Sequence, residues 1–534
     1  MTILRRDLFK LGLAAGAALS LPSISRAQAG PVDVQTVRLV LADLQVYDPM
    51  FSVGAATQNH GMAIYDTLFA LDSKFMPQPQ MVGRWGVSDD KRTYTFELRD
   101  GLGWHDGTPV TAADCVASIR RWGQTGSGEL LMERAKDISK KDDKTFTISL
   151  KEPLGALTER LATLAGNCLF IMREKDADRP ATEQVTTNIG SGPFKFNEAL
   201  VKPGVSFAYD RNERYVPRRE PSDGFAGGKV VNVDHIICEN IGSQQTALAA
   251  LQAGEIDAIY GPPVDLYSVI ESDPNLVIQV IDKAGDDACL RLNHLQKPFN
   301  NVKARQAMLH LIDQEAVLRV IAPDSRYGRP VTSIFGNSTP YSNDEKTDWY
   351  QPGGDPERAK QLFQEAGYAG EKVVILQRSD TAVVVNATQV VAAKLREIGV
   401  NAELAPSDYG AYSKRRANKG PVEDGGWSLF MSSDSDYVQG DPTAAIYLNA
   451  SGENAWYGWP KNDEFEALRA KWPDIETIDH RKALARQMQS IWWDFVGDIR
   501  LGQVLTTGTF ARRAALTGFI EMPQRVALWN LQKV

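Results

Sequence analysis

Residues 94–122, YTFELRDGLGWHDGTPVTAADCVASIRRW, constrain the fold of this chain more than any other segment. Apolar and polar side chains alternate over residues 94–98, as is typical of a half-buried strand. Two Asp-Gly pairs follow and indicate turns. Thr111 then stands three residues before Asp114, an approximate capping box that predicts the start of a helix. The segment therefore predicts a strand, two turns and a capped helix, which by itself is a structural corner and indicates no function.

The same segment carries a specific string of residues: Arg99-Asp100-Gly101, Trp104-His105-Asp106-Gly107, Pro109 and Thr111-Ala112-Ala113-Asp114. This string resembles the signature of the family 5 extracellular solute-binding proteins, the dipeptide-, oligopeptide- and nickel-binding proteins that serve ABC importers. Further strings resemble the family in the same order, at residues 65–69, 190–194, 209–215, 292–293, 298–299 and 302–307. The resemblance therefore covers essentially the whole chain after its N-terminal signal.

The resemblance implies an α/β, two-lobed periplasmic-binding-protein fold of type II, in the large form that has an extra subdomain in lobe one. We expect lobe one at residues 30–285, with an extra α+β subdomain at about 60–185. Lobe two is expected at 286–503, and residues 504–534 are expected to return to lobe one. A chain of this length also implies more than one hydrophobic core. In such a fold the ligand binds between the lobes, which close on it by a hinge motion.

Local patterns predict α/β elements in both halves of the chain. Residues 243–254 indicate a helix with a serine cap and a glycine stop, and a strand follows at 256–260. Asp355-Pro356 begins a second helix, whose apolar residues recur at helical spacing. A strand, a helix and a strand are then expected at 373–377, 388–398 and 401–404. Helix and strand units of this kind build a sheet with helices on its faces.

The N-terminus resembles an export signal at residues 1–29. Arg5-Arg6 precedes an apolar run from Leu11 to Leu21, and Ala27-Gln28-Ala29 provides small residues at a cleavage site. This pattern indicates the twin-arginine route, with an ordinary secretory signal as the alternative. The apolar run is too short to span a bilayer, which needs about 20 apolar residues. No cysteine lies in or just after the signal, so we expect a free periplasmic protein without a lipid anchor.

Charge and cysteine usage exclude several classes of protein. The net charge of −8 becomes more negative when the basic signal is removed, which disfavours binding to nucleic acid or to anionic membrane. The four cysteines form no CxxC pair, so a structural zinc site is not expected. An oxidising compartment permits disulfides, but three pairings of four cysteines remain open. We expect a monomer whose partners are a small-molecule or peptide ligand and the permease subunits of an ABC transporter.

The sequence offers no catalytic constellation. Its six histidines show neither HxxxH nor HxH spacing, and no GxSxG string occurs. We therefore expect no catalytic residues, no metal ligands and no cofactor, and we expect that the protein is not an enzyme. An exported hydrolase with a carboxylate pair is the remote alternative, because acidic residues are plentiful.

The expected ligand site rests on charge recognition. A zwitterionic peptide needs an acid for its amine and a fork of donors for its carboxylate, which arginine supplies. The resemblance implies such an arginine at Arg378, after a strand end, and an acid at Asp436 or at neighbouring Asp434. It also implies lobe-one contacts from Tyr47, in the loop after the first strand, and from Ser191, in a glycine-flanked loop. A glycine pair of this kind lets backbone approach a ligand.

Aromatic residues offer a second mode of recognition. Trp456 and Trp459 lie in a glycine-containing stretch that predicts stacking on a sugar or an aromatic ligand, with core packing as the alternative. The tryptophan that usually precedes the acid in the family is absent here, which argues for a cargo other than a plain dipeptide. The leading hypothesis is a peptide or peptide-like solute, captured for import. The alternatives are an opine, an oligosaccharide or an aromatic solute, and a binding protein that serves a chemoreceptor.

Overall fold

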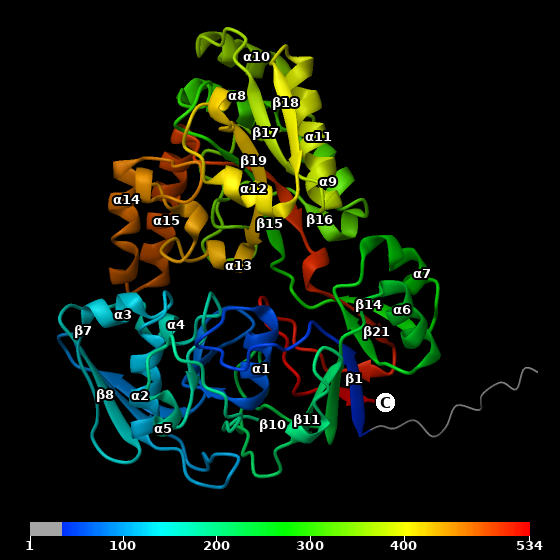
Figure 1. Cartoon of the computed structure of the whole chain (residues 1–534). Coiled ribbons are helices and arrows are strands. Elements are labelled where there is room, and N and C mark those ends of the chain that lie inside the picture. The colour runs from blue at the N-terminus through cyan, green and yellow to red at the C-terminus, as the bar shows by residue number, and fades with distance from the viewer. Residues whose placement is uncertain (1–34) are drawn as a thin grey trace, which may run out of the picture.

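The computed structural model describes residues 35–534, which form two lobes, one above the other (Figure 1). Each lobe is built around its own β-sheet. Two large groups of buried apolar side chains, one in each lobe, form separate cores. The structure is therefore a two-lobed α/β fold, as the sequence predicts. No helix among these residues has both the length and the apolar character needed to span a membrane.

The sheet of lobe one has seven strands and mixes segments from both ends of the chain. Its order is β10 (Phe194–Phe196), β11 (Ser206–Arg211), β12 (His235–Glu239), β1 (Thr36–Val40), β13 (Ala258–Tyr260), β21 (Thr509–Arg513) and β14 (Leu276–Val280). β1 is parallel to both of its neighbours, and β21 is antiparallel to β13 and β14. The C-terminal segment therefore completes a sheet that the N-terminal segment begins.

Helices α1 (Ala55–Ile64), α6 (Gln244–Ala253) and α7 (Tyr267–Glu271) belong to this lobe. α6 confirms the predicted caps. The Ser243 hydroxyl accepts a hydrogen bond from the Thr246 amide at 3.3 Å, and Gly254 ends the helix in the left-handed conformation. Both features join residues only a few positions apart, which is why the sequence predicts them.

A smaller antiparallel sheet forms a subdomain within lobe one. Its order is β5 (Val82–Val87), β6 (Thr93–Leu98), β8 (Thr145–Leu150) and β7 (Ala135–Lys140). α2 (Ala112–Trp122) packs on it, and α3 (Glu129–Arg134), α4 (Leu157–Leu161) and α5 (Glu174–Ala177) lie nearby. The predicted capping box is present, because Asp114 accepts a hydrogen bond from the Thr111 amide at 2.8 Å. The strand, turns and helix expected at residues 94–122 are thereby confirmed.

The sheet of lobe two has six strands, in the order β16 (Gly328–Arg329), β20 (Ile499–Val504), β15 (Asp286–Leu292), β19 (Leu429–Ser435), β17 (Val373–Arg378) and β18 (Ala402–Ser407). β17 is parallel to β18 and to β19, so these three strands end at the same edge. Figure 1 shows that this edge of β19, where α13 (Asp436–Gln439) begins, faces lobe one. The helices of this lobe are α8 (Val302–Leu311), α9 (Gln314–Ile321), α10 (Pro356–Glu365), α11 (Ala382–Glu397), α12 (Tyr409–Arg416), α13 (Asp436–Gln439), α14 (Asp463–Arg469) and α15 (Ile478–Phe495).

One predicted boundary in lobe two is wrong. The helix expected at 388–398 begins at Ala382, six residues earlier. Residues 382–387 contain three consecutive valines, whose β-branched side chains lower helix propensity. Burial of one face of α11 overrides that preference, since Ala387, Thr388 and Val391 are all fully buried. The cap and proline start predicted for α10 are confirmed.

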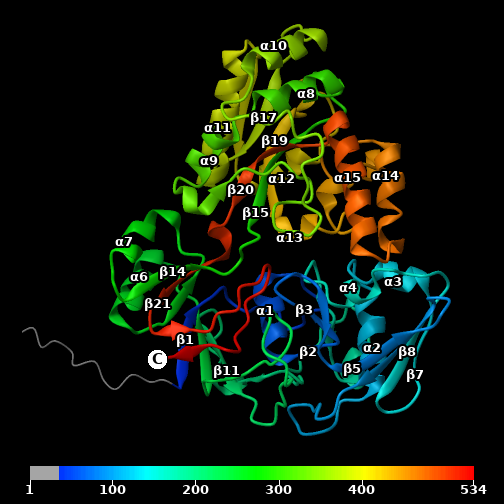
Figure 2. The same ribbon diagram turned by 180° about the vertical axis from the view of Figure 1, so that it is seen from behind.

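The chain passes between the lobes at two neighbouring segments. One joins β14 to β15, and the other joins β20 to β21. They are hydrogen-bonded to each other, because the amides of Ile281 and Asp282 both donate to the carbonyl of Gly508, at 2.8 and 3.1 Å. Figure 2 shows both segments from behind, on the same side of the molecule as β14 and β21. The pairing of the cysteines, left open by the sequence, is also answered: Cys115, Cys168, Cys238 and Cys289 are free and buried.

Candidate ligand site between the lobes

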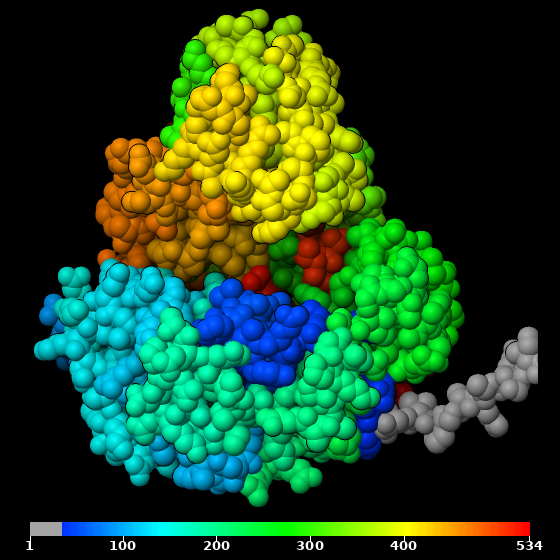
Figure 3. Space-filling model, viewed as in Figure 1, coloured from blue at the N-terminus to red at the C-terminus, as the bar shows by residue number. Residues whose placement is uncertain are grey.

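The two lobes enclose a hollow at the centre of the molecule (Figure 3). On the side away from the connecting segments the lobes meet and surround a cavity of about 230 Å³, which we call the inter-lobe cavity. Phe75 and Ala156 of lobe one and Tyr437 and Trp472 of lobe two contribute to its walls. Because both lobes line it, the inter-lobe cavity exists only when they are together.

Ion pairs join the lobes around this cavity. Arg160 of α4 contacts Asp441 at 3.2 Å, and Arg481 of α15 contacts neighbouring Glu159 at 2.9 Å. Arg134 is paired with Asp474 a short distance away. The side chain of Arg481 is only 5% exposed, so loss of its partner costs more than it would in a solvated pair. These contacts hold the described conformation in a closed arrangement on this side.

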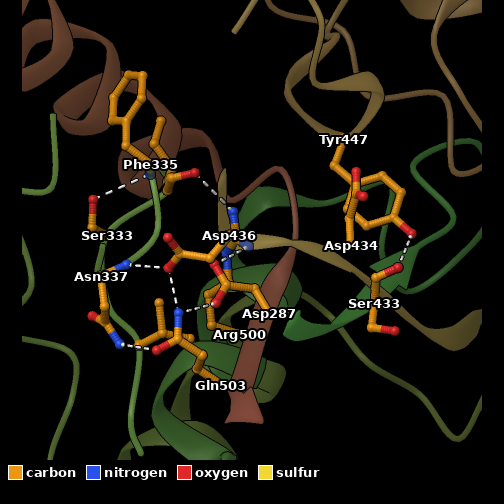
Figure 4. A network of polar contacts seen from close by, with 12 residues as sticks. Asp287, Ser333, Phe335, Asn337, Ser433, Asp434, Asp436, Tyr447, Arg500 and Gln503 are labelled. Atoms are coloured by element: carbon orange, nitrogen blue, oxygen red, sulfur yellow. Dashed lines mark hydrogen bonds and ion pairs between the residues drawn. The ribbon is translucent and has the colours of Figure 1, made fainter. Parts of the chain in front are cut away.

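Asp436, one of the two expected acids, is fully buried inside lobe two. Its carboxylate accepts hydrogen bonds from the backbone amides of Asn337 and Ser338 and from the side chain of Gln503 (Figure 4). Burial raises its pKa to about 6. Since its oxygens already have partners within the lobe, Asp436 has no free side for a ligand amine in this conformation.

Asp434, two residues earlier at the end of β19, has a more open environment. Its Oδ1 accepts only the amide of the next residue, Ser435, at 2.9 Å. Figure 4 shows its side chain beside Tyr447, away from Asn337 and Gln503. Burial raises its pKa to about 6 as well, and the charge of Asp286 adds to the effect. Of the two expected acids, Asp434 is therefore the one with an oxygen left for a ligand.

Arg378 lies at the carboxyl end of β17, where the sequence predicts it. Its guanidinium already forms a two-pronged contact with Asp380, since Nε and Nη2 each donate to one oxygen of that carboxylate at 3.1 Å. The guanidinium also lies 4.8 Å from the centre of the Tyr409 ring. A ligand carboxylate would have to displace Asp380 or share the fork with it.

The two expected tryptophans have different surroundings. Trp459 is 5% exposed and packs on Trp427, so it belongs to the core of this face. Trp456 is half-buried, and the guanidinium of Arg416 lies 5.1 Å from its ring. Among residues 35–534 no ion pair involves Arg416, and its Nε is buried without a hydrogen bond. Arg416 is a cation that sequence patterns do not single out, because only the fold brings these rings around it.

The lobe-one residues expected at the site are packed within that lobe. The Tyr47 ring lies 5.7 Å from the ring of His60 and 5.3 Å from that of Phe196. Ser191 is 3% exposed, and its hydroxyl has no hydrogen-bond partner among the residues described. A contact of either residue with ligand stays a prediction.

The glycines that flank Ser191 have a packing role here. A Cβ at Gly190 would lie 1.7 Å from the carbonyl oxygen of Ile64, so the close approach is to the end of α1. His105 holds this loop, because the amide of Gly190 donates to its Nδ1 at 3.1 Å and its Nε2 donates to the carbonyl of Gly192 at 3.3 Å. Burial lowers the His105 pKa to about 4, which keeps the ring neutral and able to make both bonds. The string around His105 thus anchors the loop around Ser191.

A buried polar group beside the site was missed by the sequence analysis. Asp287 of β15 and Arg500 and Gln503 of β20 are all fully buried next to Asp436. Burial and the charge of Asp436 raise the pKa of Asp287 well above its usual value. The signal available in the sequence was a set of charged and amide residues within the otherwise apolar stretch IRLGQVL, since buried polar groups need partners.

Comparisons with known proteins agree with this architecture. The chain is 62% identical over the full length of both chains to a protein of Sinorhizobium fredii described as a probable peptide ABC transporter periplasmic-binding protein. An ABC transporter substrate-binding protein of Listeria monocytogenes superimposes with a TM-score of 0.78 at 21% identity, covering 94% of this chain and 99% of the other. A dipeptide-binding protein of Pseudoalteromonas, solved in complex with Met-Leu, gives a TM-score of 0.71 at 18% identity, covering 94% and 100%.

A family model identifies the chain at the level of sequence. Residues 76–455 match the middle region of the bacterial extracellular solute-binding proteins of family 5. The match spans the signature around His105, the glycine loop around Ser191, and both acids at the end of β19. The chain is therefore a member of the bacterial extracellular solute-binding proteins of family 5.

Proposed function

We propose that this protein is the periplasmic substrate-binding component of an ABC importer and that its cargo is a peptide or a peptide-like solute. The observation that carries the proposal is the inter-lobe cavity, whose walls come from both lobes and include Tyr437 and Val438 of α13, the helix that follows β19. A protein that binds by closing two lobes needs such a shared surface. The 62% identical relative is described as a probable peptide ABC transporter periplasmic-binding protein, which supports this class of cargo.

Charged groups of opposite sign support a zwitterionic ligand. Asp434 has an oxygen available for an amine, and Arg378 presents a planar fork for a carboxylate once Asp380 is displaced. Both belong to the edge of the lobe-two sheet that faces lobe one, at the ends of the parallel strands β19 and β17. Asp436 then has a structural role, because it orders the segment that contains Asn337 and Ser338.

The proposal is tested by ligand discovery on the mature protein. We expect material purified without denaturation from the periplasm to release a peptide-like compound that mass spectrometry identifies. Adding that compound back should raise the melting temperature and leave the compound intact after prolonged incubation. A cargo without peptide character would refute the cargo class, and turnover would refute the assignment as a pure binding protein.

We also propose export by the twin-arginine route. The supporting pattern, Arg5-Arg6 before the apolar run, lies outside the described residues. Changing both arginines to lysine should leave precursor in the cytoplasm, whereas lysine substitutions at Arg218 and Arg219, far from the signal, should not. Normal periplasmic yield of the Arg5→Lys, Arg6→Lys variant would refute this route.

A further inference from the structure

The inter-lobe cavity presents apolar surface and no unpaired charge. The rings of Phe75 and Tyr437, from opposite lobes, lie 5.5 Å apart, and those of Tyr341 and Trp472 lie 4.8 Å apart. The charged groups that reach the cavity wall are all paired, as Arg160–Asp441, Arg481–Glu159 and Lys91–Glu476. Nε of Arg160 and Nη2 of Arg481 are buried without a hydrogen-bond partner among the described residues, but each guanidinium already has its carboxylate. A charged occupant would therefore lose hydration without gaining an unpaired counter-charge. The chemistry of the walls selects an apolar group.

The size of the cavity selects one side chain. Its volume of about 230 Å³ is below the roughly 300–1,000 Å³ of pockets that enclose whole drug-sized ligands. It is above the roughly 150 Å³ of an apolar cavity that accepts benzene. The space therefore fits an aromatic or a branched aliphatic side chain, while the rest of a peptide-like ligand lies outside it.

The position of the cavity connects it with the charged end of the site. Tyr437 and Val438, which line it, belong to α13, and α13 begins two residues after Asp434. Asp434 and Tyr437 are thus three positions apart at the junction of β19 and α13, which is the basis for assigning the amine and one side chain of the same ligand to them. Because lobe one supplies Phe75 and Ala156 on the other wall, a side chain in the cavity contacts both lobes only in the closed form.

We propose that the inter-lobe cavity is a specificity pocket that takes one large apolar side chain, aromatic or branched aliphatic, of the peptide-like cargo. This inference rests on the proposed function. It assigns the selectivity for apolar cargo to the contact between α4 and α13 and leaves charge recognition to Asp434 and Arg378. The side chain also bridges the lobes, so cargo that fills the cavity favours closure.

The test compares matched dipeptides by calorimetry: Ala-Ala, Ala-Phe, Phe-Ala, Ala-Leu and Leu-Ala. We expect the wild-type protein to bind the better-placed Phe and Leu peptides about 10- to 100-fold more tightly than Ala-Ala, as the burial of a whole apolar side chain implies. Filling the cavity with Ala156→Phe, or independently with Ala165→Phe, should reduce this ratio to below about threefold. Ala253→Phe, on an exposed position of α6, should leave the ratio unchanged.

The outcomes separate the two proposals. If dipeptides bind but the ratio is near one in the wild type, or persists in both folded filling variants, the specificity pocket is refuted and the proposed function stands. If no dipeptide binds, the same ratio is measured between the co-purified peptide-like compound and its analogue with methyl in place of the largest apolar side chain, and a ratio near one refutes the pocket. A co-purified compound without peptide character refutes the proposed function, and the specificity pocket falls with it. Two filling positions are used so that the test does not depend on one substitution, and melting curves check that each variant is folded.

Discussion

Asp287 and Asp436 accept hydrogen bonds from the same nitrogen, Nε2 of Gln503, although neither side chain has measurable contact with solvent. The bond to Asp287 is 3.0 Å long. Two carboxylates on one amide in a buried site disfavour simultaneous ionisation, and the pKa of each is raised. Asp287 lies on β15, Asp436 begins α13, and Gln503 lies on β20. The strands β15 and β20 are the two that join the inter-lobe connections.

Replacing the shared donor should cost more stability at high pH. The amide of Gln503 stabilises the ionised forms of both carboxyls. In Gln503→Met this donor is absent, so the pKa of each carboxyl rises further. An acid with a raised pKa destabilises the folded state as the pH rises through that pKa. The free energy of unfolding of Gln503→Met should therefore fall further below that of wild type at pH 7.5 than at pH 5. We expect the difference to be about 1–2 kcal/mol in urea unfolding.

Gln439→Met is the matched control for Gln503→Met. Gln439 is also a fully buried glutamine, but neither of its side-chain polar atoms has a hydrogen-bond partner among residues 35–534. Its replacement should change stability equally at both pH values. Equal costs of Gln503→Met at pH 5 and at pH 7.5 would contradict the account of the acid pair.

Neutralising Asp434 should stabilise the ligand-free protein at neutral pH. Burial raises its pKa from 3.8 to about 6, so the folded state binds the proton more tightly than the unfolded state. The stabilising contribution is complete below about pH 4 and is lost as pH rises through 6. Asp434→Asn should therefore gain on the order of 1–3 kcal/mol over wild type at pH 7.5 and nothing at pH 4.

The comparison with wild type at each pH matters for this prediction. Burial lowers the pKa of His60 to about 3, and that group destabilises the fold as the pH falls below 6.5 in both proteins. Because His60 is the same in both proteins, its contribution cancels when the free energy of unfolding of wild type is subtracted from that of Asp434→Asn. Asp463→Asn, at a carboxyl that is 87% exposed, should show no such pH dependence. A stability gain that persists unchanged at pH 4 would disprove the assignment to Asp434.

Removing one ion pair between the lobes should open the ligand-free protein. Glu159→Gln leaves the buried guanidinium of Arg481 without its carboxylate, which disfavours the closed arrangement by about 1–2 kcal/mol after allowance for the exposure of Glu159. Small-angle scattering should show a larger radius of gyration than for wild type. Arg84→Ala breaks an exposed pair within lobe one and should change nothing. An unchanged radius in Glu159→Gln would show that this pair does not hold the lobes together.

Arg378 and its neighbour Asp380 should have opposite effects on the binding of a carboxylate ligand. Loss of one partner of a desolvated charge pair costs about 2–5 kcal/mol, so Arg378→Ala should weaken binding at least 30-fold. Arg378→Lys should also lose affinity, because an ammonium does not reproduce the fork. Asp380→Asn frees that fork and should strengthen binding several-fold.

Calorimetry with the identified ligand and its C-terminal amide checks the prediction for Arg378. The amide lacks the carboxylate, so it should bind wild type and Arg378→Ala with similar affinity. If Arg378→Ala binds the free acid as tightly as wild type does, another cation has this role, and Arg416, whose Nε is buried without a hydrogen bond, is the next to replace.

Much of the fold follows from interactions between residues that are near in sequence. The capping box of α2, the serine cap and glycine end of α6, and the proline start of α10 each join groups three or four positions apart, and each is present. The spacing of apolar residues, every second residue in strands and every third or fourth in helices, predicted the strands and helices themselves. The start of α11 was misplaced because burial against the lobe-two sheet outweighed the preference of three valines.

By itself, the sequence determined the family, the two-lobed class and the stretch in which the acids and Arg378 lie, because ordered strings and local hydrogen bonds carry that information. Only the tertiary structure decided which acid is available. Asp436 is occupied by Asn337, Ser338 and Gln503, which come from segments far away along the chain, whereas Asp434 is not. Availability of a side chain depends on desolvation and on partners brought together by packing, and neither is encoded in the residues beside it.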